Sequence, residues 1–265
     1  MYYIDTHAHI YPDAIAEKAA LSIGEFYSIP MRMPGTLSGL MERGAEAGIR
    51  RHLVHSVAIT PSRVKGVNDY LIRTAAEHPD RLIGFGSLHP DFPDVKGELR
   101  RIKDAGLHGV KLHPDFQKFY LDDPSALAMF REMAALGLPA LVHTGDSRYP
   151  YSEPGRMAAA LRAVPDLKAI CAHLGGWSVW DEAWKELAEL PNAWVDTSSS
   201  LYAVTPEKGA EIIRHYGAER VFFGTDYPMW DPAEEVKRLE ALPLTPRELE
   251  LIAHESFEAF LKGLN

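Results

Sequence analysis

The chain has 265 residues, 46% of them hydrophobic and 25% charged, a composition typical of soluble globular proteins. Its formal net charge of −9 speaks against nucleic acid as a partner, because phosphate binding needs a basic surface. The lone cysteine, Cys171, excludes a framework of internal disulfides, and no apolar run is long enough to span a bilayer. Since no charged-then-apolar leader precedes the first strand, we expect a cytoplasmic protein.

Short apolar runs, each the size of a strand, alternate along the chain with amphipathic segments. The runs cover residues 3–4, 52–57, 82–88, 109–112, 140–143, 169–172, 194–196 and 221–224. Helix-like segments lie between them, among them residues 38–47, 68–77, 125–136, 156–164, 180–189 and 206–216, and residues 245–261 form a closing helix. The runs begin about 25–50 residues apart, which is the length of a strand-helix unit.

The spacing of these runs predicts the fold. Near-continuous apolar strands are buried on both faces, as parallel strands require. Eight repeats of strand and helix favour a closed (β/α)8 barrel, the TIM barrel, over an open doubly wound sheet. No linker, low-complexity tract or sequence repeat interrupts the pattern. We therefore predict an α/β protein with a single TIM-barrel domain over residues 1–265 and a C-terminal closing helix.

Polar residues stand where the predicted strands end. His7 and His9 lie two apart in the first strand, so both imidazoles point to the same side. The ends of later strands carry Lys111, His113, His143, His173 and Asp226. The carboxyl ends of barrel strands carry the active site, and a buried aspartate is rare unless it is paired or bound to metal. Imidazoles and a carboxylate are ligands of Zn²⁺ and similar ions, so the pattern indicates a metal site.

This pattern of strand-end residues resembles that of the amidohydrolase superfamily. Within it, the chain is most similar to the amidohydrolase-related branch, which contains aminocarboxymuconate-semialdehyde decarboxylase and γ-resorcylate decarboxylase. The resemblance covers nearly the whole chain. It implies an acid/base role for His173 and a site for one divalent ion, zinc first and manganese as the alternative, held by His7, His9, His143 and Asp226. Members of this branch are often dimers, so the resemblance also implies a homodimer.

Four further residues are candidates for binding the substrate. In other branches of the superfamily a lysine at the position of Lys111 is carboxylated and bridges two metal ions, whereas here we favour contact with a substrate carboxylate. His113 points the same way as Lys111 if the strand persists, and a loop histidine bonded to backbone is the alternative. Arg148 could supply a second cation, and Trp177 is one of several aromatic residues that follow the strands. These features suggest a planar or partly apolar small-molecule substrate with a carboxylate.

The leading hypothesis is a metal-dependent hydrolase. A metal-activated water would attack the carbonyl of a small amide or lactone, with Asp226 and His173 as catalytic residues. The alternative is a metal-dependent non-oxidative decarboxylase, a carboxy-lyase, of an aromatic or unsaturated carboxylic acid. The same residues serve both reactions, because each needs a Lewis acid and a proton carrier.

The sequence is also compatible with two different kinds of protein. One is a metal-free lactonase, in which the histidines and the aspartate act on the substrate directly. The second is a barrel that binds a ligand without catalysis. The histidines of the second strand, His52 and His55, are given no functional role.

Overall fold

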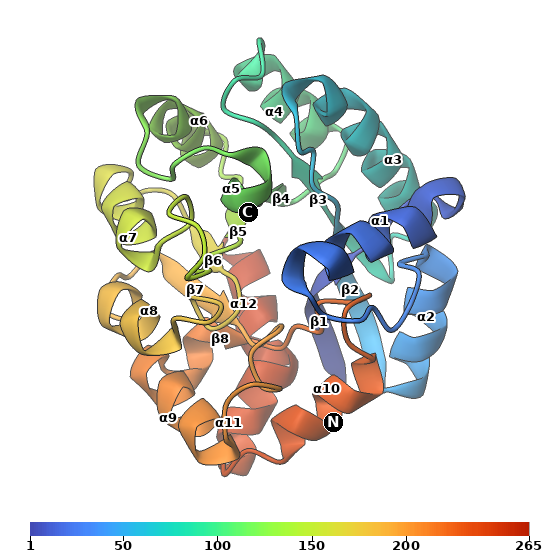
Figure 1. Cartoon of the computed structure of the whole chain (residues 1–265), viewed down its shortest axis with the longest axis vertical. Coiled ribbons are helices and arrows are strands. Elements are labelled where there is room, and N and C mark those ends of the chain that lie inside the picture. The colour runs from blue at the N-terminus through green and yellow to red at the C-terminus, as the bar shows by residue number, and fades with distance from the viewer. Residues whose placement is uncertain (265) are drawn as a thin grey trace.

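The computed structural model describes residues 1–264 and shows eight parallel strands that alternate with helices around a nearly closed barrel (Figure 1). The strands pair in chain order, each with the next. They are β1 (Tyr3–His9), β2 (Ile49–His55), β3 (Leu82–Ser87), β4 (Gly109–Leu112), β5 (Ala140–Val142), β6 (Ala169–Cys171), β7 (Ala193–Asp196) and β8 (Val221–Phe222). The predicted TIM barrel is confirmed, and every strand overlaps the apolar run predicted for it.

Helices form the outer ring of the barrel. They are α1 (Asp13–Tyr27), α2 (Leu37–Glu46), α3 (Val64–Glu77), α4 (Val95–Asp104), α5 (Pro114–Gln117), α6 (Pro124–Ala135), α7 (Pro154–Ala163), α8 (Trp180–Leu187), α9 (Pro206–Tyr216), α10 (Pro232–Glu240), α11 (Pro246–Glu250) and α12 (Ser256–Lys262). A π-helical turn, Leu251–Glu255, joins α11 to α12, so the predicted closing helix is present as three consecutive segments. The sequence had not singled out α1, α4, α5 or α10. Within residues 1–264 no helix is long and apolar enough to cross a membrane.

The amino end of the barrel is filled by apolar side chains. In Figure 1, α12 lies behind the strands. Its Phe257 and Phe260 pack into a buried cluster that the strands supply from Ile4, Leu53, Ile83, Phe85, Leu141, Ile170, Ala172 and Phe222. Phe222 and Phe257 meet edge to face with ring centroids 5.2 Å apart. Because this end is packed and closed, a ligand can reach the barrel only from the carboxyl ends of the strands.

The barrel closes between β8 and β1 through residues that follow β8, because β8 itself is only two residues long. The backbone N–H of Thr6 donates to the carbonyl of Phe223 over 2.8 Å. The N–H of Asp226 donates to the carbonyl of His7, also over 2.8 Å. These bonds bring the end of β1 and the loop after β8 side by side, which places His7 and Asp226 next to each other.

The carboxylate of Asp5 reinforces this closure from inside the barrel wall. Asp5 is fully buried and accepts hydrogen bonds from the backbone N–H and the hydroxyl of Thr225, at 2.9 and 2.8 Å. It also accepts from the N–H of His7 at 3.1 Å and lies 3.3 Å from Nδ1 of His52. The buried hydrogen-bond donors of Thr225, His7 and His52 therefore all have the carboxylate of Asp5 as their acceptor.

We predict that Asp5→Ala lowers the free energy of unfolding by about 3–5 kcal/mol, because it leaves several buried donors without an acceptor. Asp94→Ala is the matched control, since Asp94 caps α4 at an exposed site and its removal costs about 1 kcal/mol. Urea unfolding of both variants measures the difference. Equal losses of stability would show that Asp5 does not hold the barrel closed.

Candidate metal centre

Ionisable side chains from six strands and the segments that follow them gather at the carboxyl end of the barrel. β1 and β2 contribute residues that lie within the strands, and β4 contributes a lysine. The other residues lie in the segments that follow β5, β6 and β8. All of them are buried, with at most 8% of the residue surface exposed: His7, His9, His55, Lys111, His143, His173 and Asp226. A buried ionisable group needs a partner or an ion, so the contacts of each decide what the site can do.

The structure brings His7, His9 and Asp226 together. Oδ1 of Asp226 lies 3.5 Å from Nε2 of His7 and 3.4 Å from Nε2 of His9. On its other side, Nδ1 of His7 lies 2.8 Å from Oδ2 of the buried Asp196. This contact keeps the proton of His7 on Nδ1, so that Nε2 presents its lone pair to the site. A histidine oriented by a carboxylate in this way is a common arrangement at metal sites.

The protonation states suit a cation. Burial lowers the pKa of His9 to about 4, so the ring is neutral at neutral pH. Burial works to raise the pKa of Asp226, but the nearby His7, His9 and His173 outweigh it and hold the pKa of this carboxyl well below its usual range. Neutral imidazoles and an ionised carboxylate form a mixed nitrogen and oxygen donor set, which fits a divalent ion such as Zn²⁺ or Mn²⁺.

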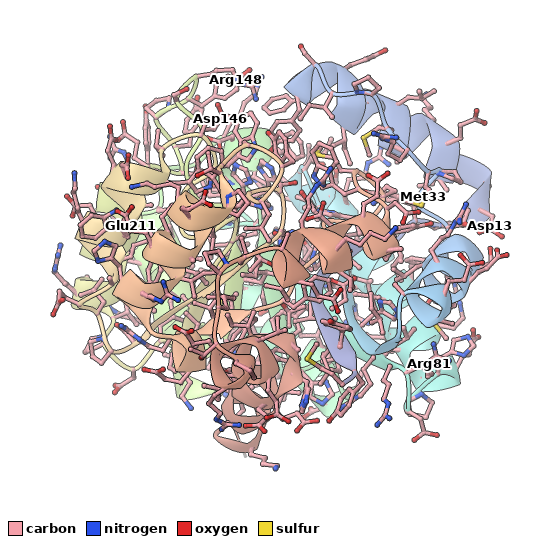
Figure 2. All side chains as sticks on the ribbon, turned by 90° about the horizontal axis from the view of Figure 1, so that it is seen from below. Asp13, Met33, Arg81, Asp146, Arg148 and Glu211 are labelled. Carbon is pink, nitrogen blue, oxygen red and sulfur yellow. The ribbon has the colours of Figure 1, made fainter. Side chains whose placement is uncertain are left out.

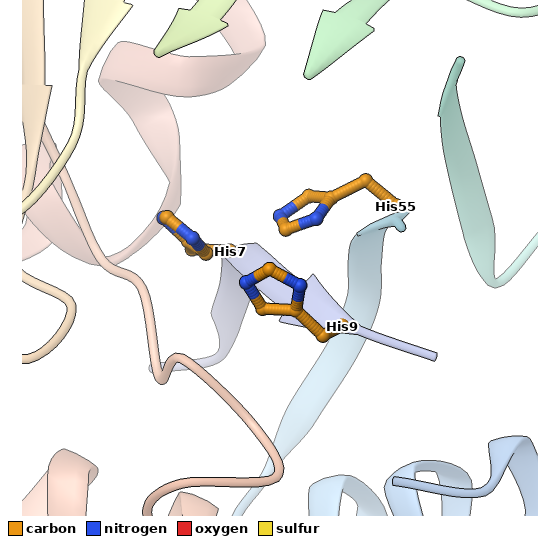
Figure 3. A group of neighbouring side chains, drawn as sticks. All are labelled: His7, His9 and His55. Carbon is orange, nitrogen blue, oxygen red and sulfur yellow. The ribbon is translucent and has the colours of Figure 1, made fainter. Parts of the chain in front are cut away.

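A third imidazole, which the sequence analysis had left without a role, belongs to this group. His55 is the last residue of β2 and pairs in register with His9 of β1. Its ring lies edge-on to His9 at 4.3 Å and to His7 at 4.8 Å between centroids (Figure 3). One potential ligand atom from each of the three residues lies within 4.8 Å of the others. The signal was present in the sequence: His55 ends a strand, as the other candidates do.

His143 contacts His173, Asp115 and His113. Its Nδ1 lies 3.0 Å from Nε2 of His173, and its Nε2 lies 3.5 Å from Oδ2 of Asp115. The ring of His113 stacks on that of His143 at 3.9 Å with only 8° between the planes. His113, Asp115 and His143 also place ligand atoms within 4.8 Å of one another, but the lone pairs of two parallel stacked rings do not converge on one ion. The role of His143 as a metal ligand therefore stays a prediction.

The hydrogen bonds of His173 fix which of its nitrogens can take part in chemistry. Nδ1 lies 3.1 Å from the carbonyl oxygen of Ser198, which can only accept, so Nδ1 carries the proton. Nε2 is then the acceptor that faces His143. Burial lowers the pKa of His173 to about 4. On its other side, His143 contacts Asp115, a residue that the sequence analysis did not identify. Burial raises the pKa of Asp115 to about 7.

Lys111 lies fully buried beside His7, with Nζ 3.0 Å from Nε2 of that ring. Within residues 1–264, no carboxylate oxygen lies within 4.0 Å of this ammonium group. Burial lowers the pKa of Lys111 to about 8. The ammonium is thus a cation whose charge is not matched by an adjacent partner, and it lies next to the atoms that could bind a metal ion.

A pocket opens above these residues. Its polar wall is made by His9, Lys111, His113, His143, His173 and Asp226. Its apolar wall is made by Ile23, Tyr27, Met31, Phe116, Pro228 and Met229. Ile23 and Tyr27 belong to α1, which lies in front of the strands in Figure 1. Apolar walls with a few convergent polar groups are typical of small-molecule sites.

Two predicted substrate-binding residues lie elsewhere. Arg148 donates to both carboxylate oxygens of Asp146, at 2.9 and 2.7 Å, and to the carbonyl of Phe26 at 2.7 Å. Figure 2 shows this pair at the rim of the molecule. Trp177 packs edge-on against Tyr27, with centroids 5.0 Å apart. Neither Arg148 nor Trp177 lines the cavity, and their role in substrate binding stays a prediction. Arg148 contacts the end of α1, and Trp177 supports Tyr27. His113 does line the cavity, with Nε2 2.8 Å from the Tyr27 hydroxyl.

Comparisons with known proteins agree with this architecture. A curated relative, 2-amino-3-carboxymuconate-6-semialdehyde decarboxylase of Dictyostelium discoideum, is 27% identical over 203 residues, which cover 61% of this chain and 55% of the relative. The chain thus spans about half the length of that relative.

Solved structures resemble the whole chain. A 2,6-dihydroxybenzoate decarboxylase complexed with 2,6-dihydroxybenzoate has a TM-score of 0.76 at 19% identity and covers 99% of both chains. A dihydroxybenzoic acid decarboxylase from Polaromonas sp., with bound manganese and 2-nitroresorcinol, has a TM-score of 0.72 at 17% identity and covers 98% of this chain and 97% of that one. At such identities the likeness shows the fold. The sequence pattern of the amidohydrolase family matches residues 4–260, and the chain therefore belongs to the amidohydrolase family.

Proposed function

We propose that the protein is a metal-dependent non-oxidative decarboxylase of an aromatic or unsaturated carboxylic acid. The observation that carries this proposal is Lys111. It is the only lysine or arginine on the cavity wall within residues 1–264, and its Nζ lies 3.0 Å from Nε2 of His7, a candidate metal ligand. The sequence analysis placed a hydrolase first. The curated relative and the solved structures are decarboxylases by name, and this supports the decarboxylase.

We propose that one divalent ion is held by His7, His9 and Asp226, with His143 as the ligand that the family resemblance implies. The fit rests on neutral imidazoles, an ionised carboxylate, and ring nitrogens of His9 and His143 that are buried without a hydrogen-bond partner. When bound, the ion supplies Lewis-acid polarisation of a substrate oxygen. The Polaromonas decarboxylase contains manganese, so Mn²⁺ stands beside Zn²⁺ as the candidate metal.

Residues on the cavity wall would bind the substrate and transfer the proton. The ammonium of Lys111 binds the substrate carboxylate and orients it. The bond between the carboxylate carbon and its neighbour breaks, CO₂ leaves, and the electron pair takes a proton to form the new C–H bond. His173, in its protonated form, delivers this proton from Nε2, because Nδ1 is held by the Ser198 carbonyl. The ionised Asp226 favours the protonated form of His173.

The identity of the reaction is tested with 2,6-dihydroxybenzoate and related acids in H₂¹⁸O and in D₂O. We expect CO₂ release, no ¹⁸O in the organic product, and deuterium at the carbon that lost CO₂. His173→Asn should retain bound metal and lose about 10²–10⁴-fold in rate, as expected for a missing proton donor. If amides or lactones react instead and ¹⁸O from water enters the product, the protein is a hydrolase.

We predict that Lys111→Met stabilises the chelator-treated protein at pH 7 by about 1–3 kcal/mol while abolishing turnover, because it removes a buried, unpaired charge. The pKa of Lys111 is about 8 in the folded chain, against 10.5 ordinarily. Between these values the unfolded state binds more protons, so wild-type stability should rise with pH from about 8 to about 10.5 and the variant should lack this rise. Urea unfolding across this range measures it. A variant that is less stable than wild type at pH 7 contradicts the prediction.

We predict that Asp196→Asn weakens metal binding by about 10–100-fold without unfolding the protein. Oδ1 of Asp196 accepts from the N–H groups of His173 and Ser198, and an asparagine oxygen can keep those bonds. Its NH₂ group would then face Nδ1 of His7 and force the proton onto Nε2, where the lone pair is needed. Titration with Zn²⁺ or Mn²⁺ measures the change, and Asp122→Asn, at a surface ion pair, is the control. An unchanged metal affinity would show that Asp196 does not orient His7 for metal binding.

A further inference from the structure

The hydroxyl of Tyr27 is a polar group on the otherwise apolar wall of the cavity. Tyr27 is the last residue of α1, and it lines the cavity together with Lys111 and His173. Within residues 1–264 its hydroxyl has one hydrogen-bond partner, Nε2 of His113 at 2.8 Å. A phenolic hydroxyl can donate one hydrogen bond and can also accept. Whether Tyr27 donates to His113 or accepts from it decides what the hydroxyl can offer a ligand.

The surroundings of His113 fix the direction of this bond. Nδ1 of His113 lies 3.4 Å from the backbone N–H of Phe116, which can only donate. Nδ1 therefore carries the lone pair and Nε2 carries the proton, so Nε2 donates to the oxygen of Tyr27. The ring of His113 stacks on those of Phe116 and His143, with centroids 3.8 and 3.9 Å apart. This stacking fixes the plane of the ring and thereby the direction of its N–H bond.

The phenolic proton of Tyr27 is then free to bind an acceptor in the cavity. Burial raises the pKa of this phenol well above its usual value, so the proton stays in place at neutral pH. No group within residues 1–264 accepts a hydrogen bond from this hydroxyl once its oxygen accepts from His113. Because Tyr27 lines the cavity, an oxygen of a bound molecule can take that position.

Contacts at the end of α1 hold the ring of Tyr27 in place before a ligand binds. Arg148 donates to the carbonyl of Phe26 at 2.7 Å, and its guanidinium lies over the ring of Tyr27 at 5.3 Å. Trp177 packs edge-on against the same ring, with centroids 5.0 Å apart. A donor that is already oriented binds a ligand without the entropic cost of ordering a side chain.

Tyr27 and Lys111 approach the cavity from different parts of the fold. Lys111 belongs to β4 in the barrel wall, is fully buried, and lies 3.0 Å from Nε2 of His7. Tyr27 belongs to α1, which lies in front of the strands in Figure 1. Two donors on separate elements are suited to two separate oxygens of one ligand.

We propose that Tyr27 is a substrate-binding residue whose hydroxyl donates a hydrogen bond to a substrate oxygen outside the carboxylate that Lys111 binds. The proposal rests on the proposed function for the role of Lys111. A ligand without such an oxygen would cover the phenolic proton and leave it without an acceptor, which disfavours that ligand. Tyr27 therefore selects acids that carry a second oxygen.

The test measures the Kd of 2,6-dihydroxybenzoate and of benzoate, which lacks the ring oxygens, by calorimetry. The His173→Asn protein is used, with and without Tyr27→Phe, so that slow turnover leaves the ligand intact. We expect Tyr27→Phe to raise the Kd of 2,6-dihydroxybenzoate about 10-fold and that of benzoate less than threefold. A residue that only supports α1 would change both Kd values by the same factor.

Tyr149→Phe is the matched control. Tyr149 stacks on Phe26 of α1 with centroids 5.3 Å apart, but it does not line the cavity. This variant loses a hydroxyl beside the same helix and should keep both Kd values within about threefold.

Equal factors for the two acids, or no change for either, would overturn the proposal, as would a protein that binds neither acid. The measurement is independent of the reaction. If 2,6-dihydroxybenzoate binds through Tyr27 and yet no acid releases CO₂, the proposed reaction is refuted and the role of Tyr27 is supported. If CO₂ is released and Tyr27→Phe binds both acids as before, only the role of Tyr27 is refuted.

Discussion

The geometry of the site depends on the contact between the end of β1 and the loop after β8. The buried carboxylate of Asp5 holds these two segments together through hydrogen bonds. By accepting from Thr225 and from the N–H of His7, Asp5 holds together the two segments that carry the candidate ligands. A short β8 could not provide this alone, because its two residues offer few ladder bonds. The same residue that closes the barrel therefore sets the distance between His7 and Asp226.

Three other carboxylates show how surroundings assign different tasks to one chemical group. Asp196 and Asp226 lie against histidines, which outweigh the effect of burial and hold the pKa of both carboxyls low. At Asp115 the effect of burial outweighs that of the neighbouring groups, and it raises the pKa of this carboxyl to about 7. The ionised pair orients imidazoles and can balance a cation, whereas Asp115 is suited to gain and lose a proton near neutral pH. Such divergence between nearby carboxyls is characteristic of active sites.

The sequence predicted the barrel and most strand-end residues, because buried parallel strands leave an unambiguous apolar pattern and barrel geometry assigns their carboxyl ends to the site. His55 was missed because the apolar run was taken to continue to residue 57, which put His55 inside the strand, whereas β2 ends at His55. Helix α1 was missed because its buried face consists of Ala16, Ala20 and Gly24, which give little apolar contrast. The ion pair of Arg148 depends on a loop conformation that no periodicity encodes.

The backbone at the site is itself held away from its preferred shape. His173, Ser199 and Asp226 have φ values of 62°, 43° and 56°, in the left-handed region that disfavours residues with a side chain. Each such residue costs about 1–3 kcal/mol unless its surroundings hold it. Here they do: Ser199 donates its hydroxyl proton to Oδ2 of Asp226 and accepts from the indole of Trp230 at 2.8 Å. This occupies one oxygen of Asp226 and leaves Oδ1 facing His7 and His9, so the strain is tied to the orientation that a metal ligand needs.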